Sequence, residues 1–288
     1  MLDARKPLEA LREEWKNCTR CSLGERRVAV GGSFVFGEGA PRGLLLLAEG
    51  PGQVEEERGA PFVGPSGDLL RTVLSLLEIK HYYMMNVVAC RSCSHATDQA
   101  GQPIFRHRKG KPSEPLYRDE APNKVQVAAC SPRVFEQIYL IDPILIVSMG
   151  VPATEFLLNR SVTINMERGR EREIGIPGAA FVPSVTEKRG VWHRKINGVM
   201  QAPVEQNKVR YLVLPTLHPA YVLRNKDDKR PTGPPRMFVS DLRKAHQIYK
   251  QYTVDAQFAE RGYFNNDNQM SDDDILDSLD RMNGDHDE

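Results

Sequence analysis

The sequence lacks long apolar runs: no stretch of eighteen consecutive apolar residues occurs in its 288 positions, and a helix that crosses a bilayer needs roughly that many. The first fifteen residues have the pattern of a charged amphipathic helix, not the basic stub and apolar stretch of a secretory signal. We therefore expect a cytoplasmic protein without a membrane segment.

Cysteine is also scarce, since five cysteines in 288 residues are too few, and odd in number, for a disulfide framework. The chain contains no internal repeat, no Walker loop and no full Gly-x-Gly-x-x-Gly pattern, because Gly37-Glu-Gly39 lacks the third glycine. These absences exclude a disulfide-rich scaffold and a solenoid, and they give no support to a nucleotide-binding loop. The remaining composition, 40% hydrophobic and 27% charged, is that of an ordinary globular protein.

The net charge of +1 hides an asymmetry along the chain. Residues 265–288 hold nine acidic residues and one basic residue, so the rest of the chain carries +9. A basic body suits a polyanionic partner such as nucleic acid, whereas an end rich in Asp and Asn is typical of a disordered tail. We therefore expect an α/β domain over residues 1–252 and a disordered acidic tail over residues 253–288.

Four apolar runs have the length and composition of strands, at residues 43–50, 84–90, 143–150 and 211–218. Helical periodicity lies between them, over residues 66–77 with Ser66 as the cap, over 124–141, and over 152–159 with Pro152 in the first turn. Strands that are apolar throughout and alternate with helices predict a mostly parallel sheet covered on both faces.

Residues 91–123 and 160–208 interrupt this pattern, because they are rich in Pro, Gly and charge without periodicity. We expect long loops or insertions there. Basic residues gather at 107–111 and 188–195, where they could follow a phosphate backbone or simply face solvent.

Polar residues stand at the carboxyl ends of the predicted strands, where ligands bind in open parallel sheets. Glu49 leads a turn with Gly50 and Gly52, Asn86 lies on the second strand, and His218 ends the fourth. Each signal is weak alone, but together at one edge they favour a binding site.

The cysteines are spaced like metal ligands. Cys18 and Cys21 form a Cys-x-x-Cys pair, and Cys90 and Cys130 follow at a distance. Thiolates in such a set hold zinc or an iron–sulfur cluster, and spacing alone does not distinguish the two. Cys93 is left over.

Several segments then resemble one family in order along the chain. The segment from Glu49 to Gly67 (EGPGQVEEERGAPFVGPSG) resembles the first motif of the uracil-DNA glycosylase superfamily, in particular family 4, the iron–sulfur type. Four more segments agree: CTRCS from Cys18, NVVAC from Asn86, PILIVSMG from Pro143 and PTLHPAYVLRN from Pro215. The resemblance covers residues from about 15 to about 250.

This resemblance implies a three-layer α/β/α sandwich with a central four-stranded, mostly parallel sheet. It also implies a four-iron four-sulfur cluster bound by Cys18, Cys21, Cys90 and Cys130, and a cleft for a uracil flipped out of DNA. The implied activity is that of a DNA glycosylase, which hydrolyses the N-glycosidic bond and leaves an abasic site in base excision repair. A monomer that acts on DNA containing uracil is expected.

The resemblance also implies roles for single residues. Phe62 would stack on the flipped base, Asn86 would read its Watson–Crick edge, and His218 would hydrogen-bond the uracil oxygen that gains negative charge. Glu49 is our candidate to position the attacking water or to stabilise the positive sugar, with Glu55 and Glu56 as second choices.

Further residues are expected to touch the substrate or the DNA. Backbone amides of Gly50 and Gly52, and of the helix start at Ser66 and Gly67, would meet base oxygens or phosphates. After His218, the segment Tyr221-Val222-Leu223 would wedge into the duplex and Arg224 would anchor a phosphate.

The sequence departs from the family pattern in two places. Ala48 stands where the first motif usually begins with Gly, and 39 residues separate Cys90 from Cys130, far more than the usual interval. Two alternatives therefore stay open: a DNA-binding member of the superfamily that is non-catalytic or has altered specificity and acts in replication or modification, and a zinc-stabilised interaction protein.

The acidic end also contains a helical pattern. Ser271 could cap a helix whose apolar face carries Ile275, Leu276, Leu279 and Met282. Such a helix could bind a replication or repair protein, or fold back on the basic body as a DNA mimic.

Overall fold

The computed structural model describes residues 5–106, 113–176, 185–188, 191–196, 199–200, 209–258 and 270–284. A six-stranded sheet with the order β1-β3-β2-β8-β13-β9 forms its centre. The four middle strands are parallel, namely β3 (Tyr82–Asn86), β2 (Leu44–Ala48), β8 (Leu145–Met149) and β13 (Val209–Thr216). The predicted α/β class is confirmed, and the four predicted strands form the parallel middle of a sheet that has six strands instead of four.

Two antiparallel strands that the sequence analysis missed extend this sheet at its edges. They are the short β1 (Glu38–Gly39), which pairs with β3, and β9 (Arg172–Ile176), which pairs with β13. The sheet is therefore mixed at its borders and parallel where the candidate site lies.

Alternate residues of the middle strands enter two separate cores, one on each face of the sheet. Leu45 and Leu47 of β2 pack into one core, whereas Leu44 and Leu46 pack into the other. All five residues of β2 and all five of β8 are buried. This two-sided burial explains why these strands read as continuous apolar runs.

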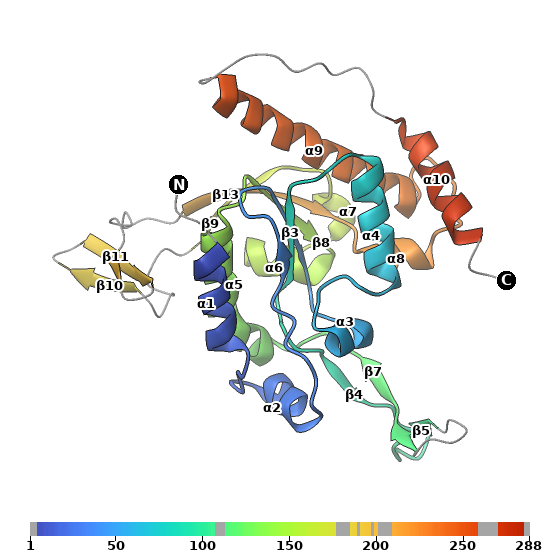
Figure 1. The fold of residues 1–288 in the computed structure, drawn as a ribbon. Helices are drawn as coiled ribbons and strands as arrows, with labels where there is room; N and C mark the ends of the chain where they lie inside the picture. The colour runs from blue at the N-terminus through green and yellow to red at the C-terminus, as the bar shows by residue number, and fades with distance from the viewer. Residues whose placement is uncertain are drawn as a thin grey trace.

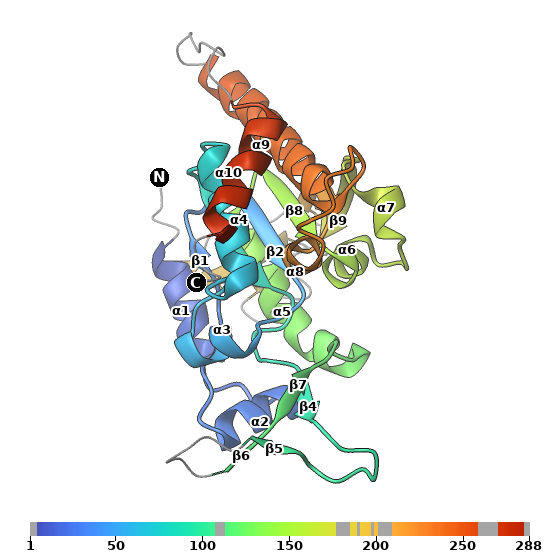
Figure 2. The same ribbon diagram turned by 90° about the vertical axis from the view of Figure 1, so that its right-hand side faces the viewer.

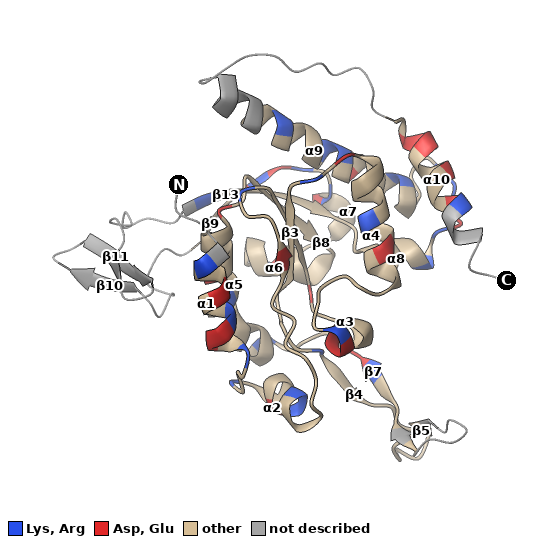
Figure 3. Ribbon diagram, in the orientation of Figure 1, with Lys and Arg blue, Asp and Glu red and all other residues tan. Residues whose placement is uncertain are grey.

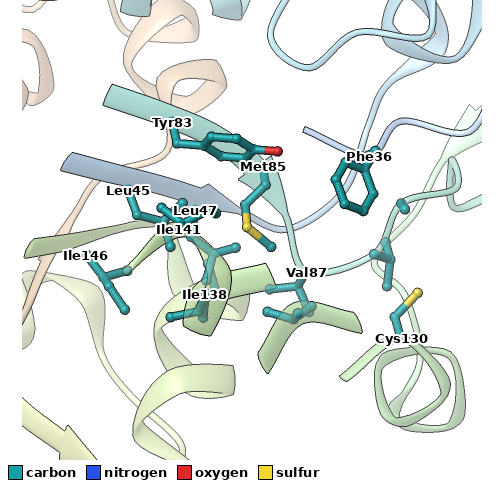
Figure 4. Close-up of a cluster of buried hydrophobic side chains, with 14 of the residues drawn as sticks. Phe36, Leu45, Leu47, Tyr83, Met85, Val87, Cys130, Ile138, Ile141 and Ile146 are labelled. Carbon is teal, nitrogen blue, oxygen red and sulfur yellow. The ribbon is translucent and has the colours of Figure 1, made fainter. Parts of the chain in front are cut away.

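Helices cover both faces and complete the three layers (Figures 1 and 2). The first core includes side chains of α1 (Arg5–Trp15), α5 (Lys124–Ile141) and α6 (Val151–Leu158). The second includes those of α4 (Pro65–Leu76), α9 (Pro234–Phe258) and α10 (Asp272–Gly284). Figure 4 shows the first core, with Cys130 at one end of the apolar cluster.

Four shorter helices lie around this frame: α2 (Ser22–Ala29), α3 (Gln53–Arg58), α7 (Ile164–Glu167) and α8 (Pro219–Arg224). The start of α4 differs from the prediction, because Gly64 and not Ser66 is its N-cap residue. Pro65 occupies the first helical position, where its fixed φ is favourable and its missing N–H costs nothing.

The two interruptions are not plain loops. Residues 91–123 form paired strands, β4 (Cys93–His95) with β7 (Tyr117–Asp119) and β5 (Phe105–Arg106) with β6 (Glu114–Pro115). Residues 160–208 supply α7, β9, and a small sheet of β10 (Val185–Lys188), β11 (Val191–Ile196) and β12 (Val199–Met200). The basic side chains at 107–111 and 188–195 lie outside the described part of the chain.

The region expected to be a disordered tail contains helical structure, because α9 continues to Phe258 and α10 follows at Asp272. Ser271 caps α10 as expected, since its hydroxyl accepts a hydrogen bond from the Asp274 amide at 3.1 Å. None of the described helices is both long enough and apolar enough to span a bilayer.

Candidate active site

A cavity of about 760 Å³ opens at the carboxyl ends of the parallel strands. Parallel strands bring their carboxyl ends to one edge, so residues distant in sequence meet there. Ten of the predicted site residues line it: Glu49, Gly50, Gly52, Glu55, Phe62, Ser66, Asn86, His218, Tyr221 and Arg224. Gly67 and Leu223 are not among the residues that line this cavity.

Glu49 follows β2 directly and is half-buried in the cavity wall. Burial raises the pKa of its carboxyl above the ordinary value. Its Oε1 atom is fully buried and has no hydrogen-bond partner among the described residues. A carboxylate in this state is available to a ligand or a water molecule.

Glu55 and Glu56 have structural partners instead. Glu55 accepts hydrogen bonds from the backbone amides of Val63 (3.1 Å), Gly64 (2.9 Å) and Gly52 (3.2 Å), and so holds the two ends of the first motif together. Glu56 is buried and pairs with Arg26. The geometry therefore favours Glu49 over both second choices.

Phe62 lines the cavity with a backbone in the left-handed region, at φ 55°. This conformation is uncommon for a large residue, and its surroundings hold it in place. The Phe62 carbonyl accepts a hydrogen bond from Arg71 at 3.2 Å. Gly67 lies so close that a Cβ atom there would be 1.9 Å from the same carbonyl oxygen. The absence of a side chain at Gly67 thus allows the Phe62 backbone to lie directly against α4.

Asn86 ends β3 with its side chain in the cavity wall and is only 3% exposed. Its backbone is fixed by Arg133 of α5, a fully buried residue. One guanidinium nitrogen of Arg133 donates to the carbonyls of Asn86 (2.7 Å) and Val87 (2.8 Å). The amide of Asn86 is therefore presented from a rigid strand end.

His218 is the N-cap residue of α8, and its Nδ1 accepts a hydrogen bond from the Ala220 amide at 3.1 Å. Burial, together with the charge of Arg224, lowers the pKa of His218 to about 4. The imidazole is neutral at physiological pH. Because Nδ1 accepts, the proton resides on Nε2, which makes that nitrogen a hydrogen-bond donor.

The segment after His218 divides between core and surface. Val222 is buried in the second core, whereas Tyr221 is 44% exposed at the cavity and Arg224 is exposed beside it. Val222 is therefore not free to enter a duplex. Tyr221 is the apolar side chain of this segment that faces both cavity and solvent.

Both insertions contribute to the cavity wall, which the sequence analysis missed. Ser92, Asp119 and Glu120 come from the first, and Ile164 and Asn165 come from the second. The Ser92 hydroxyl is buried without a partner in the described structure, like Glu49 Oε1. No local signal in the sequence marks these residues, because the pairing of Cys93 with Asp119 that closes the first insertion beside the cavity joins distant positions of the chain.

The predicted ligand cysteines all lie in or against the first core, on the opposite face of the sheet from α4. Cys90 and Cys130 are buried in the first core, and Cys18 and Cys21 pack against it. Burial raises the pKa of the Cys90 thiol to about 11. The charge of Arg27 acts to lower this pKa, whereas the thiols of Cys130 and Cys21 act to raise it. Arg27 hydrogen-bonds this thiol and the Cys18 carbonyl (3.2 Å). Across the described residues, no three Cys, His, Asp or Glu side chains are placed to hold a single metal ion.

Cys93 has different neighbours. The charged groups that act on its thiol are Arg26, Arg91, Glu56 and Asp119, and burial raises its pKa. The fifth cysteine therefore lies in an ion-pair network beside the insertion, not in the group around Cys90.

The fold and the cavity are those of an α/β enzyme with a binding site at the carboxyl ends of its parallel strands. Comparison with known families identifies the superfamily. Residues 36–239 match the Uracil DNA glycosylase superfamily, and the chain belongs to that superfamily. It is similar to the type-4 uracil-DNA glycosylase of Sulfurisphaera tokodaii, at 28% identity over 86% of this chain and 89% of the relative. It is also similar to the type-4 uracil-DNA glycosylases of Thermotoga maritima (27% identity, 85% and 95%) and Pyrobaculum aerophilum (31% identity, 52% and 64%).

Proposed function

We propose that this protein is a uracil-DNA glycosylase, which flips uracil out of DNA and hydrolyses its N-glycosidic bond to leave an abasic site. Membership of the superfamily and similarity to type-4 enzymes over most of their length support this activity. The observation that carries it is a single cavity that holds Glu49, Phe62, Asn86 and a neutral His218.

The cavity walls fit a flipped pyrimidine. Phe62 offers an apolar ring for stacking, and Asn86 offers a donor and an acceptor side by side, which match the N–H and carbonyl of a uracil edge. The buried position of Asn86 favours reading by direct hydrogen bonds, because water does not compete there.

His218 would stabilise the leaving group. As the glycosidic bond breaks, its electron pair moves onto the base and negative charge grows on a uracil oxygen. The Nε2–H of neutral His218 donates to that oxygen, and a fixed donor in a water-poor cavity is worth about 3 kcal/mol. The low pKa of His218 keeps it a neutral donor, so it polarises the oxygen without transferring its proton.

Glu49 would act on the sugar side. Its unpartnered Oε1 can accept a hydrogen bond from the attacking water, and its charge stabilises the positive sugar. The uracil anion departs with the electron pair of the broken bond, water then adds to the positively charged sugar carbon, and the proton of that water passes to the Glu49 carboxylate. Each step uses groups that line the cavity.

Outside the cavity, we propose that Tyr221 and Leu223 enter the duplex, that Arg224 binds a phosphate, and that the loop at Gly50 and Gly52 contacts the substrate. The Gly52 amide already donates to Glu55, so the shape of this loop matters more than a free amide at Gly52. We further propose that residues 1–252 form the glycosylase domain and that the protein acts as a monomer.

We also propose that Cys18, Cys21, Cys90 and Cys130 hold a four-iron four-sulfur cluster, which would act as a structural staple. The neighbouring thiols and the buried Arg27 beside them suit an anionic thiolate centre. A zinc site would need four sulfurs at about 2.3 Å from one ion. Among the described residues, no three such side chains surround one ion position.

The test is excision on a labelled single-uracil oligonucleotide, single-stranded or paired with G or A. We expect wild-type protein to give alkali-sensitive cleavage at uracil, and His218→Ala to lower the rate about 10²–10³-fold. Asn86→Ala should lower excision by a similar factor but leave duplex affinity within about twofold, since Asn86 reads the base and not the backbone. No cleavage by folded wild-type protein would favour a non-catalytic DNA-binding role.

A further inference from the structure

α10 is an acidic helix that lies on basic residues of the body. It carries five aspartates: Asp272, Asp273, Asp274, Asp277 and Asp280. Three of them form ion pairs in antiparallel order along the body, Asp272 with Arg243 (2.6 Å), Asp273 with Arg236, and Asp280 with Lys229. Figure 3 shows this acidic helix beside α8 and the near end of α9. We call Lys229, Arg236 and Arg243 the basic strip.

The helix is seated by apolar contacts as well as by charge. Ile275 is fully buried and Leu279 is 8% exposed, both within the second core beside α4 and α9. Arg243 also donates to the Met270 carbonyl at 2.6 Å, just before the helix starts. α10 is therefore a docked element that pairs with the basic strip, in which Arg243 is 18% exposed and Lys229 is 63% exposed.

The basic strip continues from the side of the molecule that is proposed to face DNA. Arg224, at the end of α8, lines the catalytic cavity. The seam between α10 and the body is lined by Val222 of α8, by Lys226 and Lys229 of the following segment, and by Arg236 of α9. Within α9, Arg236 and Arg243 are two helical turns apart, about 10 Å along the axis. A DNA strand that leaves the cavity past Arg224 would meet these cations next.

We propose that the basic strip is a second contact surface for the DNA backbone, and that α10 covers it, so that α10 and duplex DNA compete. The proposal rests on the proposed function only in taking DNA as the polyanion that reaches the neighbouring cavity. The row of aspartates presents carboxylates to the same guanidinium and ammonium groups that phosphates would use.

The test measures binding of the full chain to a labelled duplex without uracil, over a series of salt concentrations. Ile275→Ser with Leu279→Ser removes the apolar anchor and leaves every charge in place. Asp273→Asn with Asp280→Asn keeps the anchor and removes two of the competing charges. Glu173→Gln is the matched control, because it removes one acid from another surface ion pair, with Arg210 on β13.

We expect both double variants to bind the duplex about tenfold more tightly at low salt. The dependence of log affinity on log salt should steepen by about 2–3, because each additional phosphate contact adds ~0.9 to the slope. Arg236→Gln should reverse the gain in the anchor variant and change little in the wild type. Glu173→Gln should bind like the wild type.

Wild-type affinity and slope in both double variants, with their folding verified by circular dichroism, would overturn the proposal. Excision of uracil from a single-stranded oligonucleotide is measured on the same samples. Excision without an affinity gain refutes the competition and leaves the enzyme intact. An affinity gain without excision refutes the enzyme and leaves the competition.

Discussion

At the scale of single residues, the carboxylates of the first motif have separate tasks. Glu49, Glu55 and Glu56 lie within eight positions, and their order in the sequence gives no reason to choose one. The structure separates them by their partners: Glu55 binds three backbone amides and Glu56 binds Arg26, whereas one oxygen of Glu49 is buried without a partner among the described residues. Packing therefore favours Glu49, the first choice of the sequence analysis, and its catalytic role stays a prediction.

The raised pKa of Glu49 predicts that its carboxylate is needed for activity but lowers the stability of the folded protein. Burial disfavours the ionised form of this carboxyl group, so above its folded pKa the charge destabilises the fold. Glu49→Gln should therefore lower excision about 10²-fold or more and raise the melting temperature at pH 7. Below the ordinary carboxyl pKa both forms are neutral, and the stability difference should vanish.

Measurement of melting temperatures for both proteins at pH 7 and pH 4 tests this sign. Glu57→Gln is the control, because Glu57 is exposed and hydrogen-bonded only to the Gln53 side chain in the described structure. A lower melting temperature for Glu49→Gln at pH 7 would mean that the carboxylate has a stabilising partner.

The pH dependence of excision follows from the same residues. Glu49 must be ionised to accept a proton, and its pKa is raised, whereas His218 stays neutral down to about pH 4. As pH falls, Glu49 is protonated before His218. The acid limb of the pH–rate profile should therefore belong to Glu49 and lie above pH 4.5. Glu49→Gln should abolish that limb, and a limb that persists in this variant would contradict the assignment.

At the scale of elements, the contact between α4 and the Phe62 turn shapes the base-stacking wall. Gly67→Ala would place a methyl group 1.9 Å from the Phe62 carbonyl oxygen. We expect a loss of stability of about 1–3 kcal/mol and a larger KM, because Phe62 must move. Ser75→Ala, at an exposed position of the same helix, is the control. Chemical denaturation and steady-state kinetics measure the two effects.

The elements that the sequence predicted correctly share a strong pattern of apolar residues. β2 and β8 are buried on both faces, so every residue is apolar or small. The residues of α5 were predicted correctly because its apolar positions recur with helical spacing before a Pro and a strand. β1 was missed since two residues, Glu38 and Gly39, carry no periodicity. β4 and β7 were missed since their pairing joins residues more than twenty positions apart.

At the scale of the whole molecule, the folded insertion explains how a long gap between Cys90 and Cys130 preserves their proximity. The chain leaves along β4 and returns along β7, and Glu120 N–H donates to the Ser92 carbonyl at 3.0 Å. The chain therefore returns close to Cys90 before it enters α5, the helix that carries Cys130. Sequence could count the gap but not show its closure.

This arrangement predicts different outcomes for two buried cysteines. Cys130→Ser should remove the visible absorbance and most of the iron, and should lower the melting temperature by several degrees, because a metal centre bound only in the folded state stabilises it. Cys93→Ser is the matched control and should keep iron content and spectrum. Loss of iron from Cys93→Ser, together with full iron content in Cys130→Ser, would mean that Cys93 and not Cys130 is the ligand.

The closed stem of the first insertion has a consequence for how this enzyme can vary. Ser92 and Asp119 stand at the base of the stem and belong to the cavity wall, whereas the residues beyond β4 and β7 project away from it (Figure 1). The outer hairpin can therefore lengthen, shorten or be exchanged without moving the wall. The insertion is therefore an attachment point: sequence added beyond β4 and β7 would extend away from the cavity, while the reaction chamber keeps its dimensions.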